Sequence, residues 1–273
     1  HKEMLTALRW YADNGVHEAI LEQAEDYTIA PAMPSTSEML ASMRAGTPPQ
    51  PQQQSAPAFL GKSDALEEAI KLAASANNLN ELREAISKFD GIAIKKTASN
   101  LVFSDGNPKA KIMVIGEAPG ADEEREGKPF VGASGALLDK ILSCIGLSRD
   151  SEDAENAVYI SNVLNWRPPG NRTPNPAEIE VSIPFIERHI QLIKPDILIL
   201  FGAIPAKSLL ASDVSLSKMR KTKHEYKTIT ENIGDKINIP AFPTYHPSFL
   251  LNTPIQKKAV WEDMLKIQQK RQK

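Results

Sequence analysis

Apolar runs and amphipathic stretches alternate along the chain from residue 111 onward. Four short runs have the composition of buried strands: Ile112–Ile115, Ala157–Ser161, Ile197–Phe201 and Pro240–Tyr245. Segments in which apolar residues recur every three or four positions follow these runs, and this period is typical of helices packed on a core. The alternation predicts an α/β fold, specifically a three-layer α/β/α sandwich with a central, mainly parallel sheet.

The same spacing places the helices. They follow Ser134, span Ala177–Ile193 and Ala203–Leu210, and close the chain at about residues 255–270. A further helix is predicted at about residues 64–88, before the first strand. Because ligands bind at the carboxyl ends of the strands in such sheets, we expect the functional residues in the loops that follow them.

The first 61 residues differ from the rest in composition. Residues 1–27 carry apolar positions at helical spacing and predict a short N-terminal helix, whereas residues 28–61 are rich in proline and glutamine. Such a segment has too little apolar surface to offset the entropy lost on folding, so we expect a flexible linker. The expected division is a helical appendage, a linker, and an α/β domain over residues 62–273. The appendage is a candidate for binding a protein partner.

Charge is distributed unevenly along the chain. The net charge is −2, but residues 1–94 contain 7 basic and 13 acidic side chains and so carry −6, which leaves +4 on the remainder. A mildly basic body suits brief, local contact with DNA, although charge alone does not identify a DNA-binding protein. No apolar run approaches the roughly 18 residues of a membrane span, and charged residues interrupt the start of the chain, unlike a secretory signal. We expect a cytoplasmic monomer without a membrane segment.

Cys144 is the only cysteine. It cannot form an intramolecular disulfide, nor can it supply the several thiolates of an iron–sulfur or structural metal site. Its place in the apolar helical segment 135–146 predicts a small buried core residue. We therefore expect neither a cofactor nor a metal.

The first candidate loop follows the strand Ile112–Ile115. Small residues at 116–120 let a ligand approach the backbone, and Glu117 offers a carboxylate at the tip of the strand. Phe130 lies in glycine-rich sequence, where an exposed aromatic ring can stack on a flat ligand. Ser134 is expected to cap the next helix, whose N-terminus favours an anion such as a DNA phosphate.

Two later loops carry further candidates. Asn162 follows a strand, and its amide presents a donor and an acceptor together, which matches a base edge that carries one of each. Arg167 and Arg172 in the same loop are candidates for phosphate contacts. His246 ends an extended segment, and the apolar stretch Phe249–Leu251 after it looks exposed, as a wedge inserted between base pairs would be.

In combination these loops resemble the uracil-DNA glycosylase superfamily, most closely its family 4, over about residues 90–270. Their shared order and their positions at predicted strand ends make the set specific, although each motif is weak alone. The resemblance implies a DNA-repair enzyme that flips uracil out of DNA, hydrolyses its N-glycosidic bond and releases free uracil. The motifs are Gly116–Gly120, Pro129–Gly132, Asn162 with Arg167–Pro174, Glu178-Ile179 before Pro184-Phe185, and His246–Ser248.

The resemblance also implies a role for each residue of the base pocket. Glu117 would position the hydrolytic water, and His246 would stabilise negative charge on uracil O2. Asn162 would read uracil N3–H and O4, with Phe130 stacked on the base and Ala118 beside it.

A second group of residues is assigned by the same resemblance to the DNA itself. The stretch Phe249–Leu251, with Phe249 and Leu250 foremost, would fill the space in the duplex that the base vacates. Further DNA contacts are implied for Gly120, Ser134, Arg167, Arg172 and Ser248.

The chain departs from this family in its cysteines. The resemblance implies four cysteines that hold an iron–sulfur cluster, but the segment Gly91–Thr97 has none where the first pair would fall. Trp166 and Ser182 stand at the other two positions. We expect hydrophobic packing around Trp166 to support the nearby loops in place of the cluster.

Two other functions compete with this interpretation. A protein that captures uracil or abasic DNA without turnover would resemble a branch of the superfamily that cross-links through a His in a basic insertion, and Asn165–Pro169 runs on without that insertion. A nucleotide-binding or phosphate-ester enzyme that used the Gly116–Gly120 loop lacks the Gly-Lys-Ser/Thr of a P-loop and a convincing metal-binding cluster. Release of free uracil from a labelled oligonucleotide separates all three.

Overall fold

The computed structural model describes residues 62–272, which form one mixed sheet between two layers of helices. The strands are β1 (Asp105–Gly106), β2 (Ile112–Gly116), β3 (Val158–Asn162), β4 (Ile197–Phe201), β5 (His224–Lys227) and β6 (Asn238–Thr244). Their order across the sheet is β1-β3-β2-β4-β6-β5. The inner strands β3, β2, β4 and β6 run parallel, and the edge strands β1 and β5 are antiparallel to their neighbours.

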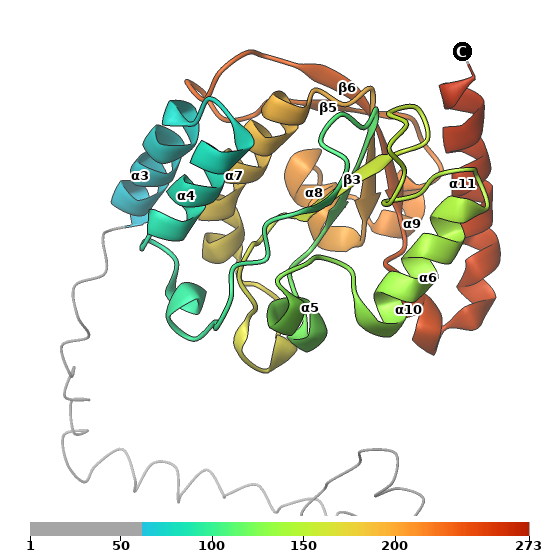
Figure 1. Ribbon diagram of the computed structural model, residues 1–273, viewed down its shortest axis with the longest axis horizontal. Helices are drawn as coiled ribbons and strands as arrows, with labels where there is room; N and C mark the ends of the chain where they lie inside the picture. The colour runs from blue at the N-terminus through green and yellow to red at the C-terminus, as the bar shows by residue number, and fades with distance from the viewer. Residues whose placement is uncertain (1–61, 273) are drawn as a thin grey trace, which may run out of the picture. The chain divides into compact units, whose positions relative to one another are not determined.

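Helices cover both faces of this sheet (Figure 1). One face carries α3 (Lys62–Ser75), α4 (Leu79–Lys88), α7 (Pro176–Ile193) and α8 (Ala203–Leu209). The other carries α6 (Gly132–Ser143), α10 (Pro247–Asn252) and α11 (Lys257–Arg271). The shorter helices are α5 (Ala121–Glu126), α9 (Leu216–Met219), η1 (Ala93–Lys96), η2 (Pro169–Asn171) and η3 (Pro254–Gln256).

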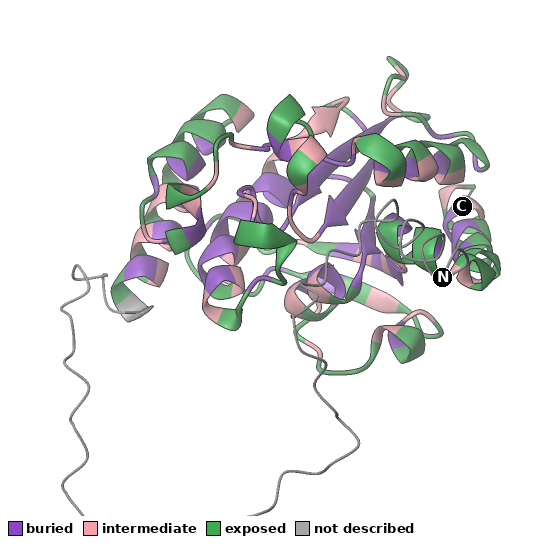
Figure 2. Ribbon diagram, turned by 90° about the horizontal axis from the view of Figure 1, so that it is seen from below, coloured by how far each residue is buried: buried purple, intermediate pink, exposed green. Residues whose placement is uncertain are grey.

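The sheet divides the core into two apolar clusters. In β2, Met113 and Ile115 pack in the cluster under α7, whereas Ile112 and Val114 pack in the cluster under α6 and α11. Alternate residues of a strand point to opposite faces, so an inner strand covered on both sides is apolar throughout. Figure 2 shows the result, with buried residues concentrated in the strands and on the helix faces turned toward them.

The predicted three-layer architecture and its four parallel strands are confirmed. The single helix predicted at about residues 64–88 is wrong, because the chain breaks at residues 76–78 and forms α3 and α4 instead. Asn78 begins α4 by accepting a hydrogen bond from the Glu81 backbone N–H at 3.0 Å. Asparagine competes with the helix in this way and favours helix starts.

Cys144 corrects a second prediction, because it is exposed rather than buried. Leu138 and Leu142 mark the face of α6 that turns inward, and Ile145 continues it. Cys144 falls two positions after Leu142, roughly 200° around the helix axis, which turns its side chain toward solvent.

The predicted N-terminal helix and linker, residues 1–61, lie outside the described residues. The division of the chain at residue 62 therefore stays a prediction. Within residues 62–272, the structure contains no helix that is both long and apolar enough to cross a membrane.

Candidate active site

The carboxyl ends of β2, β3 and β6 border one pocket of about 390 Å³, a volume within the range of small-molecule sites. All three loops predicted from the sequence contribute to its wall. The predicted site residues that line it are Glu117, Ala118, Gly120, Phe130, Ser134, Asn162, Arg172, His246 and Ser248. The predicted residues that do not line it are Arg167, Phe249 and Leu250.

Asn162 owes its place to strand register. It lies opposite Gly116 in the parallel β2–β3 pair, and the missing side chain at Gly116 leaves room for two others. A Cβ atom there would lie 2.4 Å from Asn162 Oδ1 and 2.5 Å from Phe130 Cζ. Asn162 is only 3% exposed, and among the described residues nothing hydrogen-bonds to its side-chain amide. Its donor and acceptor are therefore available to a ligand in the pocket.

Phe130 forms a buried wall of the pocket and is not the exposed aromatic that its glycine-rich surroundings predicted. Its ring fills the space over Gly116 and is 4% exposed. It stacks on the His246 ring with centroids 5.1 Å apart, and its edge meets Phe201 at 6.2 Å. The backbone φ of Phe130 is +52°, a left-handed conformation that bulky residues seldom adopt.

His246 is both the N-cap of α10 and a pocket residue. Its Nδ1 accepts from the Ser248 backbone N–H at 3.2 Å and lies 2.8 Å from Ser248 Oγ. A nitrogen that accepts carries the lone pair, so the ring proton of the neutral imidazole is on Nε2. Burial lowers the pKa of His246 to about 4, which keeps the ring neutral near pH 7. The site therefore presents a neutral Nε2–H donor.

Glu117 supplies the carboxylate of the pocket. It directly follows β2 and is half-buried, and burial raises the pKa of its carboxyl group above the ordinary value of 4.5. No side-chain hydrogen bond to Glu117 exists within the described part of the chain. A carboxylate held in this way, partly desolvated and unpaired, can accept a hydrogen bond from water or face a positive charge.

The two arginines predicted to contact phosphate are both paired with buried glutamates. Arg172 lines the pocket and binds Glu178 through two hydrogen bonds, at 2.6 and 2.9 Å. Arg167 donates to Glu124 Oε2 at 3.1 Å and to Asn171 Oδ1 at 2.8 Å, outside the pocket lining. These pairs fix the loop after β3 on both of its sides.

Ser134 lies in the first turn of α6 and does not cap it. The helix begins at Gly132 with Val131 as N-cap, so the predicted cap is misplaced by three residues. The missing side chain at Gly132 lets this first residue of the helix adopt a φ of +63°. Ser134 still lines the pocket, beside the N-terminus of α6.

Glu123 is a pocket residue that the sequence interpretation missed. Its Oε2 accepts from the Gly120 backbone N–H at 3.0 Å, and its Oε1 accepts from the Val131 backbone N–H at 3.1 Å. One carboxylate therefore ties the start of the first loop to its end. A glutamate three residues after an N-cap residue, here Gly120, supplies the glutamate half of a capping box, which was the available signal.

The structure corrects the prediction that the whole stretch Phe249–Leu251 is exposed, because these residues lie in helix α10. Leu250 is fully buried among the residues under α6 and α11, so it has no surface to insert into a duplex. Phe249 and Leu251 on either side are each 42% exposed. The prediction took all three apolar residues as exposed, whereas Pro247 at the first helical position starts a helix that turns Leu250 inward.

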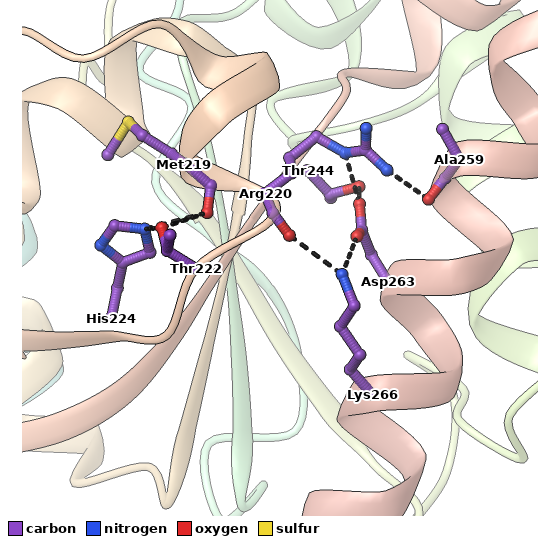
Figure 3. Close-up of polar contacts among 8 residues, drawn as sticks. All are labelled: Met219, Arg220, Thr222, His224, Thr244, Ala259, Asp263 and Lys266. Atoms are coloured by element: carbon purple, nitrogen blue, oxygen red, sulfur yellow. Dashed lines mark hydrogen bonds and ion pairs between the residues drawn. The ribbon is translucent and has the colours of Figure 1, made fainter.

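A buried ion pair supports the strand that leads to His246 (Figure 3). Asp263 on α11 accepts from Thr244 Oγ1 at 2.9 Å and from Arg220 Nε at 2.6 Å. The Arg220 guanidinium also lies 4.4 Å from the centroid of the Tyr245 ring. Thr244 and Tyr245 directly precede His246, so this network fixes the backbone from which His246 projects. The three partners are far apart in sequence, and no local pattern indicates them.

The positions implied for an iron–sulfur cluster do not hold ligands that fit one. Ile94 of η1 and Trp166 are buried in the same apolar cluster, and Ser182 donates its hydroxyl to the Glu178 carbonyl at 2.7 Å. Lys95 Nζ lies 5.9 Å from the centroid of the Trp166 ring. Across residues 62–272, no group of three or more His, Cys, Asp or Glu side chains has the geometry of a metal site. Packing occupies the region where thiolates would be needed.

Comparison with known proteins identifies the family. Residues 103–265 match the sequence family described as the uracil DNA glycosylase superfamily. Type-4 uracil-DNA glycosylase of Saccharolobus solfataricus is 38% identical over 195 residues, which cover 71% of this chain and 86% of the relative. The enzyme of the same name from Sulfurisphaera tokodaii is 34% identical over 198 residues, with 71% and 84% covered. The Archaeoglobus fulgidus enzyme is 37% identical over 175 residues, with 64% and 83% covered. The chain belongs to the uracil-DNA glycosylase superfamily.

Proposed function

We propose that this protein is a uracil-DNA glycosylase, which flips uracil out of DNA, hydrolyses its N-glycosidic bond and leaves an abasic site. The observation that carries the proposal is the Asn162 amide, 3% exposed and without a hydrogen-bond partner among the described residues. The amide atoms face the pocket and not a protein partner, so a ligand with a complementary edge can bind them. Uracil has such an edge, because its N3–H donates to the Asn162 carbonyl and its O4 accepts from the Asn162 NH2.

The base reaches this pocket by leaving the DNA stack, which costs a few kcal/mol and less when uracil is mispaired. The Phe130 ring, already stacked against His246, gives the flipped base an aromatic wall. The first turn of α6, with Ser134 in it, offers backbone N–H groups to a phosphate beside the flipped nucleotide. The same pocket is also lined by Arg172, Ser248 and Gly120.

Cleavage of the glycosidic bond leaves negative charge on uracil, and His246 stabilises it. The Nε2–H of the neutral ring donates to uracil O2, where that charge gathers. Since Nδ1 is held by the Ser248 backbone N–H, the ring needs little reorganisation as charge develops. Removing one preorganised donor of this kind typically costs about 3–4 kcal/mol in the transition state.

Glu117 acts on the sugar side of the bond. As the bond breaks, the sugar gains positive charge, and an unpaired carboxylate nearby favours that charge. The same carboxylate accepts a hydrogen bond from the water that adds to the sugar carbon. That water supplies the hydroxyl of the abasic sugar, and its remaining proton balances the uracil anion.

We also propose that the protein works as a cytoplasmic monomer, that residues 62–273 form the glycosylase domain, and that the predicted N-terminal helix docks a protein partner.

Two buried asparagines provide the test. Asn162 has no partner among the described residues, whereas Asn165 is 7% exposed and donates to the Val102 carbonyl at 3.0 Å. The experiment measures release of free uracil from a duplex with one U:G pair, under multiple turnover, for wild type, Asn162→Ala and Asn165→Ala. Thermal stability is measured in parallel.

We expect Asn162→Ala to lose at least a hundredfold in excision while its stability stays near that of wild type, because the side-chain amide faces the pocket and makes no hydrogen bond to the other described residues. Asn165→Ala should lose stability and keep most of its excision rate. Wild-type protein that binds the uracil duplex without releasing uracil would support the non-turnover binding protein instead. No effect of uracil on either binding or release would refute the proposed function.

A further inference from the structure

We propose that Arg149 is a positioning residue for Phe130: its guanidinium holds the Phe130 backbone in the conformation that the base pocket requires. The inference deepens the proposed function and rests on it, since it takes Phe130 as the wall on which uracil stacks. Arg149 itself is absent from the pocket lining and acts through the backbone behind it.

The contacts of Arg149 converge on two consecutive carbonyl groups. Its Nη2 donates to the Phe130 carbonyl at 2.9 Å, and its Nη1 donates to the Pro129 carbonyl at 3.2 Å. On its other side, Nε donates to Asp139 at 2.8 Å and Nη1 to Asp105 at 3.1 Å. The side chain is 10% exposed, so the two carboxylates both balance its charge and orient its plane.

The Phe130 backbone is one that needs such support. Its φ of +52° is disfavoured for a side chain as bulky as Phe, and such conformations persist only when surrounding contacts fix them. Gly135 of α6 closes the other side, because a Cβ there would lie 2.0 Å from the Phe130 carbonyl oxygen. The Val131 N–H is held by Glu123. The peptide group of Phe130 is thus fixed by three separate elements.

Displacement of the Phe130 backbone would change the shape of the pocket directly. The Phe130 ring stacks on His246 and lies over Gly116, where its Cζ approaches the space beside Asn162. A shift in φ would carry the ring away from His246 or toward Asn162, and either movement changes the width of the slot for the base. Arg149 therefore controls the geometry of the site without touching a ligand.

Arginine is suited to this role and lysine is not. A guanidinium presents its donors in a rigid planar fork, so a single side chain can bind two carbonyls and two carboxylates at once. The lysine ammonium is a point charge that could stay beside Asp105 and Asp139 but could not span both carbonyls of the loop. The variant Arg149→Lys consequently keeps the charge while it removes the clamp.

Arg188 offers a matched control. Its guanidinium also donates to two backbone carbonyls, those of Ala76 at 2.8 Å and Ile233 at 3.2 Å, away from the pocket lining. The experiment compares Arg149→Met, Arg149→Lys and Arg188→Met with wild type. The measurements are thermal stability, kcat and KM on single-stranded uracil DNA, inhibition by free uracil, and hydrogen exchange of residues 128–135.

For Arg149→Met we expect kcat to fall at least tenfold, inhibition by free uracil to weaken at least tenfold, and exchange at residues 128–135 to accelerate. Arg149→Lys should show the same changes at near wild-type stability, and it replaces Arg149→Met if that variant does not fold. Arg188→Met should lose stability yet stay within twofold of wild type in kcat and uracil inhibition.

Two outcomes would overturn the inference: folded Arg149 variants with wild-type kcat and uracil inhibition, or equal losses in Arg149→Met and Arg188→Met at equal loss of stability. A wild-type protein without excision would instead contradict the proposed function, and the exchange of residues 128–135 would still report on the clamp.

Discussion

In the proposed function, the identity of single side chains decides which base the pocket accepts. Uracil offers N3–H as donor and O4 as acceptor, whereas cytosine offers N3 as acceptor and its N4 amino group as donor. We expect the Asn162 amide to pair with the first edge and to oppose the second at both atoms. Two buried mismatches at about 1–3 kcal/mol each give discrimination of several orders of magnitude.

The substitution Asn162→Asp should reverse part of this preference. Aspartate lacks the donor to uracil O4 but can accept from cytosine N4, so we expect most uracil excision to be lost and weak cytosine excision to appear. The new activity should rise as pH falls, because pairing with cytosine N3 needs a proton on the base or on the aspartate. Matched U:G and C:G duplexes assayed across a pH series measure both changes. Unaltered uracil excision by a folded variant would rule out base reading by Asn162.

The pH dependence of the wild type should be set by Glu117 and not by a histidine with an ordinary pKa. Burial raises the pKa of the Glu117 carboxyl above 4.5 and lowers the pKa of His246 to about 4. Because the carboxylate is the active form of Glu117, kcat/KM should fall as the pH drops through its raised pKa. His246 stays neutral over the same interval.

The variant that tests this is Glu117→Gln. It should excise uracil much more slowly, and its kcat/KM should not show the fall at low pH that is expected for the wild type. Its residual kcat/KM should be level from about pH 5 to pH 8, because the depressed pKa of His246 keeps the ring neutral in that window. A limb near the ordinary histidine pKa of about 6.5 in both proteins would contradict the desolvated, neutral His246 described above.

Some of these side chains could be predicted from sequence and others could not. Glu117 directly follows β2, Asn162 is the last residue of β3, and His246 lies two residues beyond β6, so strand position and local motif together indicate them. Arg149 and Asp263 act through residues distant in sequence, and their side chains follow no pattern that separates them from surface charges. Burial of a charge is visible only once the fold is known.

At the level of elements, α10 determines which of its apolar residues are exposed. Phe249 and Leu251 are exposed and Leu250 is not. We expect Phe249→Ala and Leu251→Ala to reduce excision from duplexes more than from single strands, since only a duplex leaves a gap to fill. Leu251→Ala should change stability by no more than about 0.5 kcal/mol, as at other exposed positions. Phe249→Ala also loses the ring contact with Tyr245, whose centroid lies 5.1 Å away, and such a pair contributes about 0.5–1.5 kcal/mol.

Leu250→Ala serves as the contrast. Loss of a fully buried leucine should lower the free energy of unfolding by about 2–5 kcal/mol and reduce excision from both substrates alike. Parallel assays on single-stranded and U:G duplex substrates, together with denaturant titration, distinguish the two patterns. If Leu250→Ala alone were duplex-selective, the assignment from α10 would be incorrect.

Elements were predictable where their apolar pattern was long. The buried strands and α7 follow from their periodicity, whereas β1 has 2 residues and β5 has 4, too few for a pattern to emerge. Helix α10 was missed because three consecutive apolar residues suit an extended wedge as well as one helical turn, and only Pro247 at its start favoured the helix.

At the scale of the whole molecule, the loops near Trp166 need support other than the iron–sulfur cluster that the family resemblance implies. The buried Trp166, with η1 packed beside it, occupies the region, and its side chain is 8% exposed. We expect anaerobically purified protein to contain no stoichiometric iron and no visible absorbance band. Trp166→Ala should destabilise the fold by about 3–5 kcal/mol. Stoichiometric iron, or a Trp166→Ala protein as stable as wild type, would show that packing does not replace the cluster.

The order of strands has a consequence for how this site can evolve. Glu117 follows β2 and His246 follows β6, with β4 between them, and the residue after β4 is Gly202, which adds no side chain to the gap. Neighbouring strands lie about 4.8 Å apart, so the two backbones are separated by roughly 10 Å. Peptide hydrogen bonds set that spacing, and no substitution of side chains alters it. Mutation can therefore change which polar groups the pocket accepts much more readily than the width of ligand that it accepts. Proteins that evolve from this one should come to accept other bases of similar size before they accept larger ones.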